Sequence, residues 1–154
     1  YSLQLPILEL ASHLLVSGDA KALTISDLNN DGLPDFLVSV NAGRAMAFEA
    51  NPEQTNADQF LCLQLKGSEG NIDASGARVS LRGESIPTFT QQVSSGGGYL
   101  SQSSPRLFFP AGSLKGDALK ALEVLVHWPS GKQSTTKVGD LKKRDGRYWI
   151  EVSP

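Results

Sequence analysis

The stretch Asp27 to Asp35, which reads DLNNDGLPD, constrains this chain more than any other feature. Oxygen-bearing side chains occupy alternate positions, so a tight loop can turn several of them towards one hard cation. Three carboxylates this close repel one another unless a cation neutralises them. We therefore predict a Ca2+ site whose ligands are Asp27, Asn29, Asp31, the backbone carbonyl of Leu33 and Asp35, with Gly32 at the sharp bend.

The flanks of this loop predict strands rather than helices. An EF-hand needs a glutamate at position twelve and a helix on each side, but position twelve counted from Asp27 is Val38. Residues 22–26 and 36–40 are rich in β-branched and apolar side chains with period-two alternation, as in strands. The alternative that stays open is an Asn-, Asp- and Gly-rich turn that binds no ion.

Residues 22–50, ALTISDLNNDGLPDFLVSVNAGRAMAFEA, resemble one FG-GAP repeat of the integrin α type. The resemblance implies a β-propeller blade of strand, calcium loop, strand, turn and strand, in which the metal stabilises the blade. A single blade cannot bury both faces alone. We therefore expect it to dock on the following domain, on preceding blades of unknown number, or on a second copy, which predicts self-association through the exposed blade.

Alternation continues after a polar segment. Residues 51–59, NPEQTNADQ, have the composition of a linker, which predicts units at 1–50 and 60–154. Beyond it, period-two runs are bounded by turn residues and predict short strands, with no helix after residue 18. The expected fold is all-β: a calcium-binding blade-like unit packed on an antiparallel β-sandwich. The runs that carry it are Leu61, Leu63 and Leu65; Val79 and Leu81; and, within 119–128, Leu122, Val124, Val126 and Trp128.

Three segments of the second unit resemble the ASPIC/UnbV domain: GARVSL at 76–81, GGGYLSQSSPRLFF at 96–109 and LEVLVHWPSGK at 122–132. In cartilage acidic protein-like and bacterial surface proteins such domains follow FG-GAP repeats. The resemblance implies an extracellular, periplasmic or cell-surface module that binds calcium. The chain departs from the family at 108–112, which reads FFPAG where the family reads HFGLG.

The glycine run at 96–98 predicts either close backbone packing or a ligand contact. No Lys-Ser/Thr pair follows it, which excludes a phosphate loop. The contact would use an aromatic face and polar groups for a carbohydrate or protein partner. Its candidate residues are Gly97, Gly98, Tyr99, Gln102 and, from the segment 122–132, Trp128.

Charge and motif content favour a binding module over an enzyme. The net charge of −2 argues against nucleic acid, and no apolar run is long enough to span a membrane. The two histidines, His13 and His127, form no ligand spacing or catalytic motif. We expect a non-enzymatic calcium-binding extracellular or cell-surface module for adhesion, carbohydrate contact or assembly. The alternative is an accessory C-terminal part of a secreted polysaccharide hydrolase or lyase.

Overall fold

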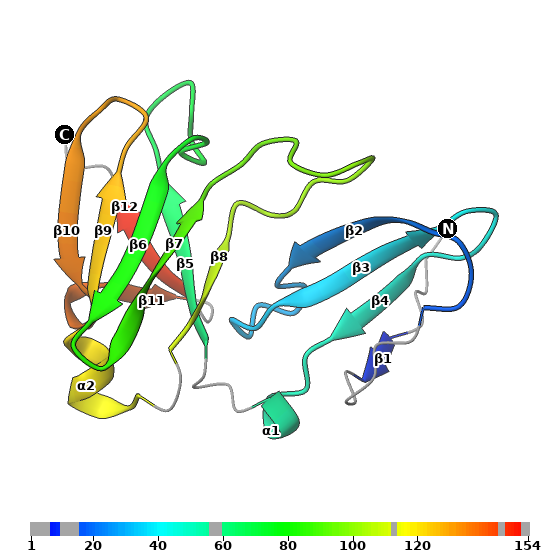
Figure 1. Cartoon of the computed structure of the whole chain (residues 1–154), viewed down its shortest axis with the longest axis horizontal. Coiled ribbons are helices and arrows are strands. Elements are labelled where there is room, and N and C mark those ends of the chain that lie inside the picture. Colours follow the sequence, from blue (N-terminus) through cyan, green and yellow to red (C-terminus); the bar gives the residue numbers. More distant parts are fainter. Residues whose placement is uncertain (1–6, 10–15, 56–59, 112–113, 145–146, 152–154) are drawn as a thin grey trace.

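The computed structural model describes residues 7–9, 16–55, 60–111, 114–144 and 147–151. Over these residues the fold is all-β, as predicted, and its strands form three four-stranded sheets. Figure 1 shows one sheet standing apart from the other two, which face each other as a sandwich. His13 lies outside the described residues, as do residues 56–59 of the predicted linker.

The N-terminal sheet, which we call the blade-like sheet, contains the aspartate loop. Its strand order is β1-β4-β3-β2; β2, β3 and β4 form an antiparallel meander, whereas β1 runs parallel to β4. The aspartate loop connects β2 to β3. The strands are β1 (Ile7–Glu9), β2 (Ala20–Ser26), β3 (Asp35–Val40) and β4 (Met46–Glu49).

The sandwich is built from sheets with the orders β10-β9-β6-β7 and β11-β12-β5-β8. Its pairs are antiparallel except that β12 runs parallel to β5. The strands are β5 (Phe60–Lys66), β6 (Arg78–Gly83), β7 (Ile86–Gln92), β8 (Leu107–Pro110), β9 (Glu123–His127), β10 (Gln133–Lys137), β11 (Lys142–Arg144) and β12 (Arg147–Glu151).

The alternating runs do line the sandwich core, because one face of each strand packs against the opposite sheet. Their inward side chains are almost completely buried, and Phe109 from β8 packs among them with no exposed surface. The alternating residues in this core are Leu61, Leu63, Leu65, Val79, Leu81, Leu122, Val124 and Val126. Trp128 joins the same cluster and donates from Nε1 to Ser134 Oγ at 2.9 Å.

The expectation of no convincing helix after residue 18 is confirmed for long helices only, because the helical elements of the described residues span three to five residues each. Short helices form at α1 (Pro52–Thr55) and α2 (Gly116–Lys120), and a 3-10 turn, η2, spans Val138–Asp140. In α1, Asn51 Oδ1 accepts from the Glu53 N–H at 2.9 Å, which caps the first turn. The run predicted as a strand from 119 therefore begins as a helix, and the strand is confined to β9.

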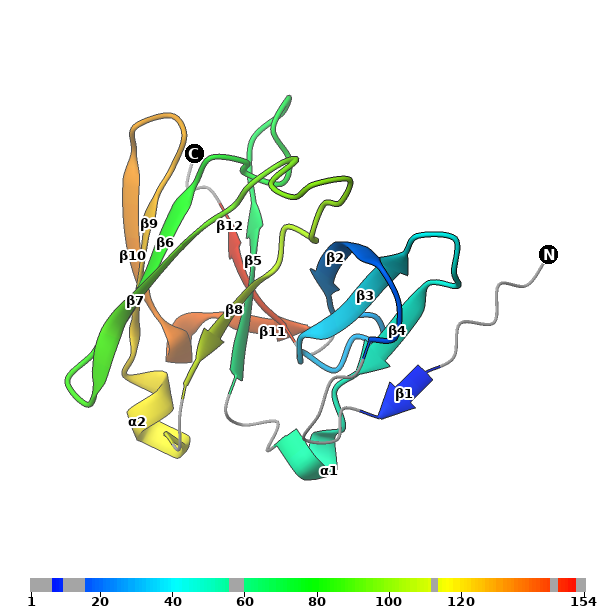
Figure 2. The ribbon, with the colours of Figure 1, turned by 45° about the vertical axis from the view of Figure 1, so that its right-hand side comes forward.

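The connection from β7 to β8 brings the sandwich to the blade-like sheet. In both views this segment, residues 93–106, leaves the sandwich and extends towards β2 (Figures 1 and 2). Ser104 donates its backbone N–H to the Ile25 carbonyl at 3.0 Å, and Ile25 donates its own N–H to Ser103 Oγ at 3.1 Å. The aspartate loop, which follows β2, is thereby held beside the sandwich.

Candidate metal centre

The aspartate loop folds on itself because its side chains replace backbone hydrogen-bond partners. Asn29 Oδ1 accepts from the Asp31 N–H at 3.0 Å, and Asp31 Oδ1 accepts from the Leu33 N–H at 2.7 Å. Such Asx turns are what Asn and Asp favour in tight loops. Asn30 at φ 64° and Gly32 at φ 89° take left-handed conformations that these residue types tolerate.

Asp27 is a buried carboxylate with one unpaired oxygen. The residue is 3% exposed, and its Oδ2 accepts from the Gly32 N–H at 3.3 Å. Its Oδ1 is buried and has no hydrogen-bond partner among the residues that the structure describes. A buried, unpaired carboxylate oxygen is costly unless a cation or another donor meets it.

Asp35 is fully buried, and both of its oxygens accept backbone hydrogen bonds. Oδ2 accepts from the Leu28 N–H at 2.6 Å, and Oδ1 accepts from the Ala50 N–H at 2.8 Å. Burial raises the pKa of this carboxyl above its ordinary value; the two backbone donors oppose the rise, and the nearby charges of Asp31 and Asp27 add to it.

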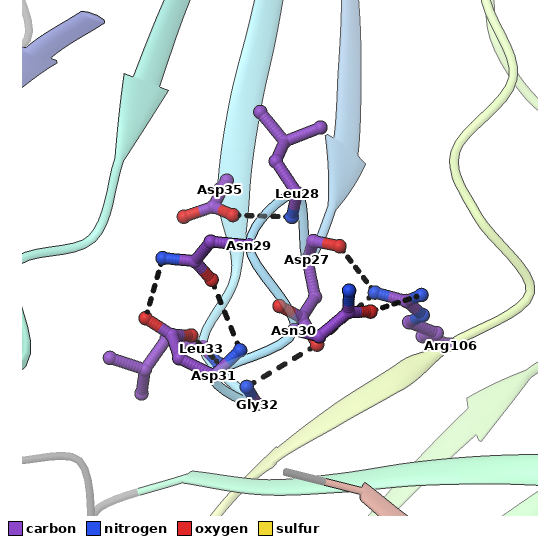
Figure 3. A network of polar contacts seen from close by, with 9 residues as sticks. All are labelled: Asp27, Leu28, Asn29, Asn30, Asp31, Gly32, Leu33, Asp35 and Arg106. Atoms are coloured by element: carbon purple, nitrogen blue, oxygen red, sulfur yellow. Dashed lines mark hydrogen bonds and ion pairs between the residues drawn. The ribbon is translucent and has the colours of Figure 1, made fainter. Parts of the chain in front are cut away.

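Arg106 approaches the same loop from the sandwich side, just before β8. Its Nη1 lies 3.1 Å from Asp27 Oδ2 and also donates to the Asp27 carbonyl. Its Nη2 donates to Asn30 Oδ1 at 3.2 Å. Figure 3 shows the guanidinium beside Asp27 and Asn30, while Asn29 and Asp31 lie on the opposite side of the loop.

The residues present fit a hard cation in their chemistry. Asp27, Asn29 and Asp31 are brought into one small hydrogen-bonded loop, and Asp35 stands at its end. The carboxylate of Asp35 keeps lone pairs beyond those that its backbone donors use. Within the described residues, no three His, Cys, Asp or Glu side chains already converge as a ligand group. A cation bound in the loop would supply a partner for Asp27 Oδ1, which has none among the described residues.

One contact would have to change if both Asn29 and Asp31 were ligands. Asn29 Nδ2 donates to Asp31 Oδ2 at 3.0 Å and so occupies an oxygen of that carboxylate. Leu33, predicted to contribute its carbonyl, is only 1% exposed, and its N–H donates to Asp31 Oδ1.

The predicted ligand-contact residues are not brought together into one exposed surface. Tyr99 is 75% exposed and lies in a tight turn closed by the Gly98–Ser101 bridge, and Gln102 is exposed beside it. Trp128, in contrast, is buried in the sandwich core at 5% exposure. Leu100, which sequence reasoning did not single out, is 77% exposed next to Tyr99 and has φ 53°.

Sequence reasoning also missed the partners of the aspartate loop. Arg106 lies 79 residues from Asp27, and Ala50 lies 15 residues from Asp35. Arg106 lies in the 96–109 segment, whose sequence points to a family resemblance and to a ligand contact at Tyr99 and Gln102 but not to a role for Arg106. No local pattern marks a residue whose role is set by the docking of two units.

Comparison with known proteins identifies the second unit. Residues 67–144 match the family model described as ASPIC and UnbV. This span begins directly after β5 and ends with β11, so it contains most of the sandwich together with Arg106. No curated protein matches the chain. In the described part of the chain, no helix is both long and apolar enough to cross a membrane.

Proposed function

The chain belongs to the ASPIC and UnbV family, and from this membership and the geometry of the aspartate loop we propose that it is a calcium-braced, non-catalytic accessory module. Domains of this family are typically accessory modules and commonly occur in extracellular or surface proteins. Calcium is abundant in such compartments, and weak extracellular sites with millimolar dissociation constants are common there. The proposal therefore places a structural cation in a module that acts outside the cell.

The observation that carries the proposal is the unpaired, buried Oδ1 of Asp27. The proposed ligands are those predicted from the sequence: Asp27, Asn29, Asp31, the Leu33 carbonyl and Asp35. A bound cation supplies positive charge to three carboxylates that otherwise repel one another. Because the aspartate loop joins β2 to β3 and contacts the sandwich, the ion would brace the junction of the two units.

The turn at Gly98–Ser101 supports a role in contact with a partner. It displays the neighbouring side chains of Tyr99 and Leu100, both more than 70% exposed. Leu100 keeps a left-handed backbone conformation that is unfavourable for a leucine, without burying its side chain in return. We propose this turn as the surface that contacts a carbohydrate or protein partner.

Thermal unfolding with and without calcium tests the metal assignment. A ligand that binds only the folded chain stabilises it by about 2.7 kcal/mol at one hundred times its dissociation constant. For a chain of this size the melting temperature should then rise by about 5–10 °C. Asp27→Asn should abolish most of this rise. Asp117→Asn, which changes a fully exposed aspartate of α2, should leave the rise intact.

Two results would contradict the proposal. If calcium leaves the melting curve of the wild type unchanged, the loop is an Asn- and Asp-rich turn that binds no ion. If the purified chain hydrolyses or cleaves polysaccharides, the module is catalytic. Binding of a polysaccharide without turnover supports the accessory role.

A further inference from the structure

Arg106 lies within the family-matched part of the sandwich, but its described polar contacts are with the aspartate loop of the other unit. It contacts the Asp27 carboxylate and carbonyl and the Asn30 side chain. Its own side chain is 16% exposed, so these contacts are largely shielded from water. An arginine held by several acceptors in fixed directions is well suited to orient a carboxylate.

The contact divides the two oxygens of Asp27 between different roles. Arg106 and the Gly32 N–H both approach Oδ2, at 3.1 and 3.3 Å. Oδ1 is left buried and unpaired among the described residues. Arg106 thus fixes the carboxylate in the orientation that keeps Oδ1 available for a cation.

The net charge of the aspartate loop together with Arg106 matches one divalent cation. The loop carries three carboxylates, at Asp27, Asp31 and Asp35, and Arg106 contributes one positive charge at its edge. Two negative charges remain, which is the charge that one divalent cation neutralises. A trivalent ion, or a second divalent one, would leave the site positively charged.

Polar contacts carry much of the junction between the two units, because apolar packing does not fill it. A cleft of about 460 Å3 lies there, lined by Ile25 and Phe36 on one side and Phe108 on the other. Beside it, Ser103 and Ser104 pair with the backbone of β2 and Arg106 pairs with the loop. Loss of Arg106 would therefore loosen the docking as well as the loop.

We infer that Arg106 is a positioning residue that completes the proposed calcium site, which is consequently composite, with ligands from the blade-like sheet and an orienting side chain from the sandwich. This inference rests on the proposed function. By linkage, calcium binding and docking of the two units stabilise each other. Substitution of residues that orient metal ligands typically weakens metal affinity by about 10–100-fold.

Calorimetric titration of the full chain with calcium tests the inference at a temperature where each variant is folded. Arg106→Gln should weaken binding by about 10–100-fold. Arg106→Lys keeps the charge but loses the planar fork, and it too should bind more weakly than the wild type. The matched control is Arg82→Gln, because Arg82 pairs with Glu123 within the sandwich and should leave affinity unchanged.

Asn30→Gly supplies a second variant in case Arg106→Gln does not fold. It removes the Asn30 oxygen that holds Nη2 while suiting the φ of 64° at that position, and it removes no proposed ligand. Its affinity should fall in the same direction but by less. Limited proteolysis between β4 and β5 gives an independent readout: calcium should protect the wild type more than Arg106→Gln.

The outcomes separate this inference from the function on which it rests. If the wild type binds calcium and Arg106→Gln binds equally well or more tightly, Arg106 does not position the Asp27 carboxylate for the cation, and the inference fails while the proposed function stands. Full affinity in Arg106→Lys also overturns it, because charge and not orientation would then suffice. If the wild type binds no calcium, both fail.

Discussion

Asp35 Oδ1 accepts the backbone N–H of Ala50 at 2.8 Å, which ties the start of β3 to the point where the chain leaves β4. The other oxygen of the same carboxylate accepts from Leu28 within the aspartate loop. Ala50 is 4% exposed, so water cannot readily replace this acceptor. One side chain therefore fixes both the loop and the exit from the blade-like sheet towards the sandwich.

Asp35→Ala should destabilise the calcium-free chain by about 2–4 kcal/mol, because it leaves a buried backbone donor unpaired and breaks a second hydrogen bond to a charged group. Urea denaturation without calcium measures the change. Asp19→Ala is the matched control: Asp19 is exposed and pairs only with Lys21 and Asn41 among the contacts described. A surface substitution of this kind should change stability by less than about 0.5 kcal/mol. Equal effects of the two substitutions would show that the Asp35 contacts contribute nothing.

The raised pKa of Asp35 predicts a pH dependence in the calcium-free chain. The largest cause of the raised pKa is burial of the carboxyl, so the folded state holds the proton more tightly than the unfolded state. The group therefore contributes stability below its ordinary pKa of 3.8, and this contribution is lost as the pH rises through the raised pKa. As the pH rises from 3.8 through the raised pKa, the free energy of unfolding of the wild type should fall relative to that of Asp35→Asn. Urea denaturation at a series of pH values measures this difference. A difference independent of pH would contradict the raised pKa.

The sequence predicted those strands that bury one face in the sandwich core. Leu61, Leu63 and Leu65 alternate because β5 presents that face to the core, and burial leaves a period of two in the sequence. Helix α2 escaped prediction because none of its five residues is buried, so burial imposes no helical pattern on it. The parallel pairing of β5 with β12 joins distant segments, and no local pattern specifies it.

The aspartate loop was predictable in its composition but not in its surroundings. The spacing of Asp27, Asn29 and Asp31 is local, and these three residues do share one hydrogen-bonded loop. Arg106 could not be found in the same way, because its contact with Asp27 exists only when the two units dock. Calcium at this loop and the unit boundaries at 51–59 stay predictions.

Adjacent glycines in the exposed turn offer a final prediction with an internal control. A Cβ at Gly98 would lie 2.3 Å from Ser101 Oγ and 2.9 Å from the Ser101 carbonyl oxygen, whereas a Cβ at Gly97 would meet only Ser94 Cβ, at 3.6 Å. The Ser101 hydroxyl can rotate away, but its backbone carbonyl cannot without opening the turn. Gly98→Ala should therefore open the turn that presents Tyr99, and Gly97→Ala should not.

Limited proteolysis of the folded chain measures this opening. Cleavage within residues 95–102 should become about tenfold faster in Gly98→Ala, which corresponds to a local cost of about 1.4 kcal/mol, while Gly97→Ala should match the wild type. Global stability should change little in either variant, because the turn lies outside the sandwich core. Where a polysaccharide binds the wild type, Gly98→Ala should weaken that binding and Gly97→Ala should preserve it. Equal cleavage rates in the two variants would mean that the conformation of the turn does not depend on the missing Cβ of Gly98.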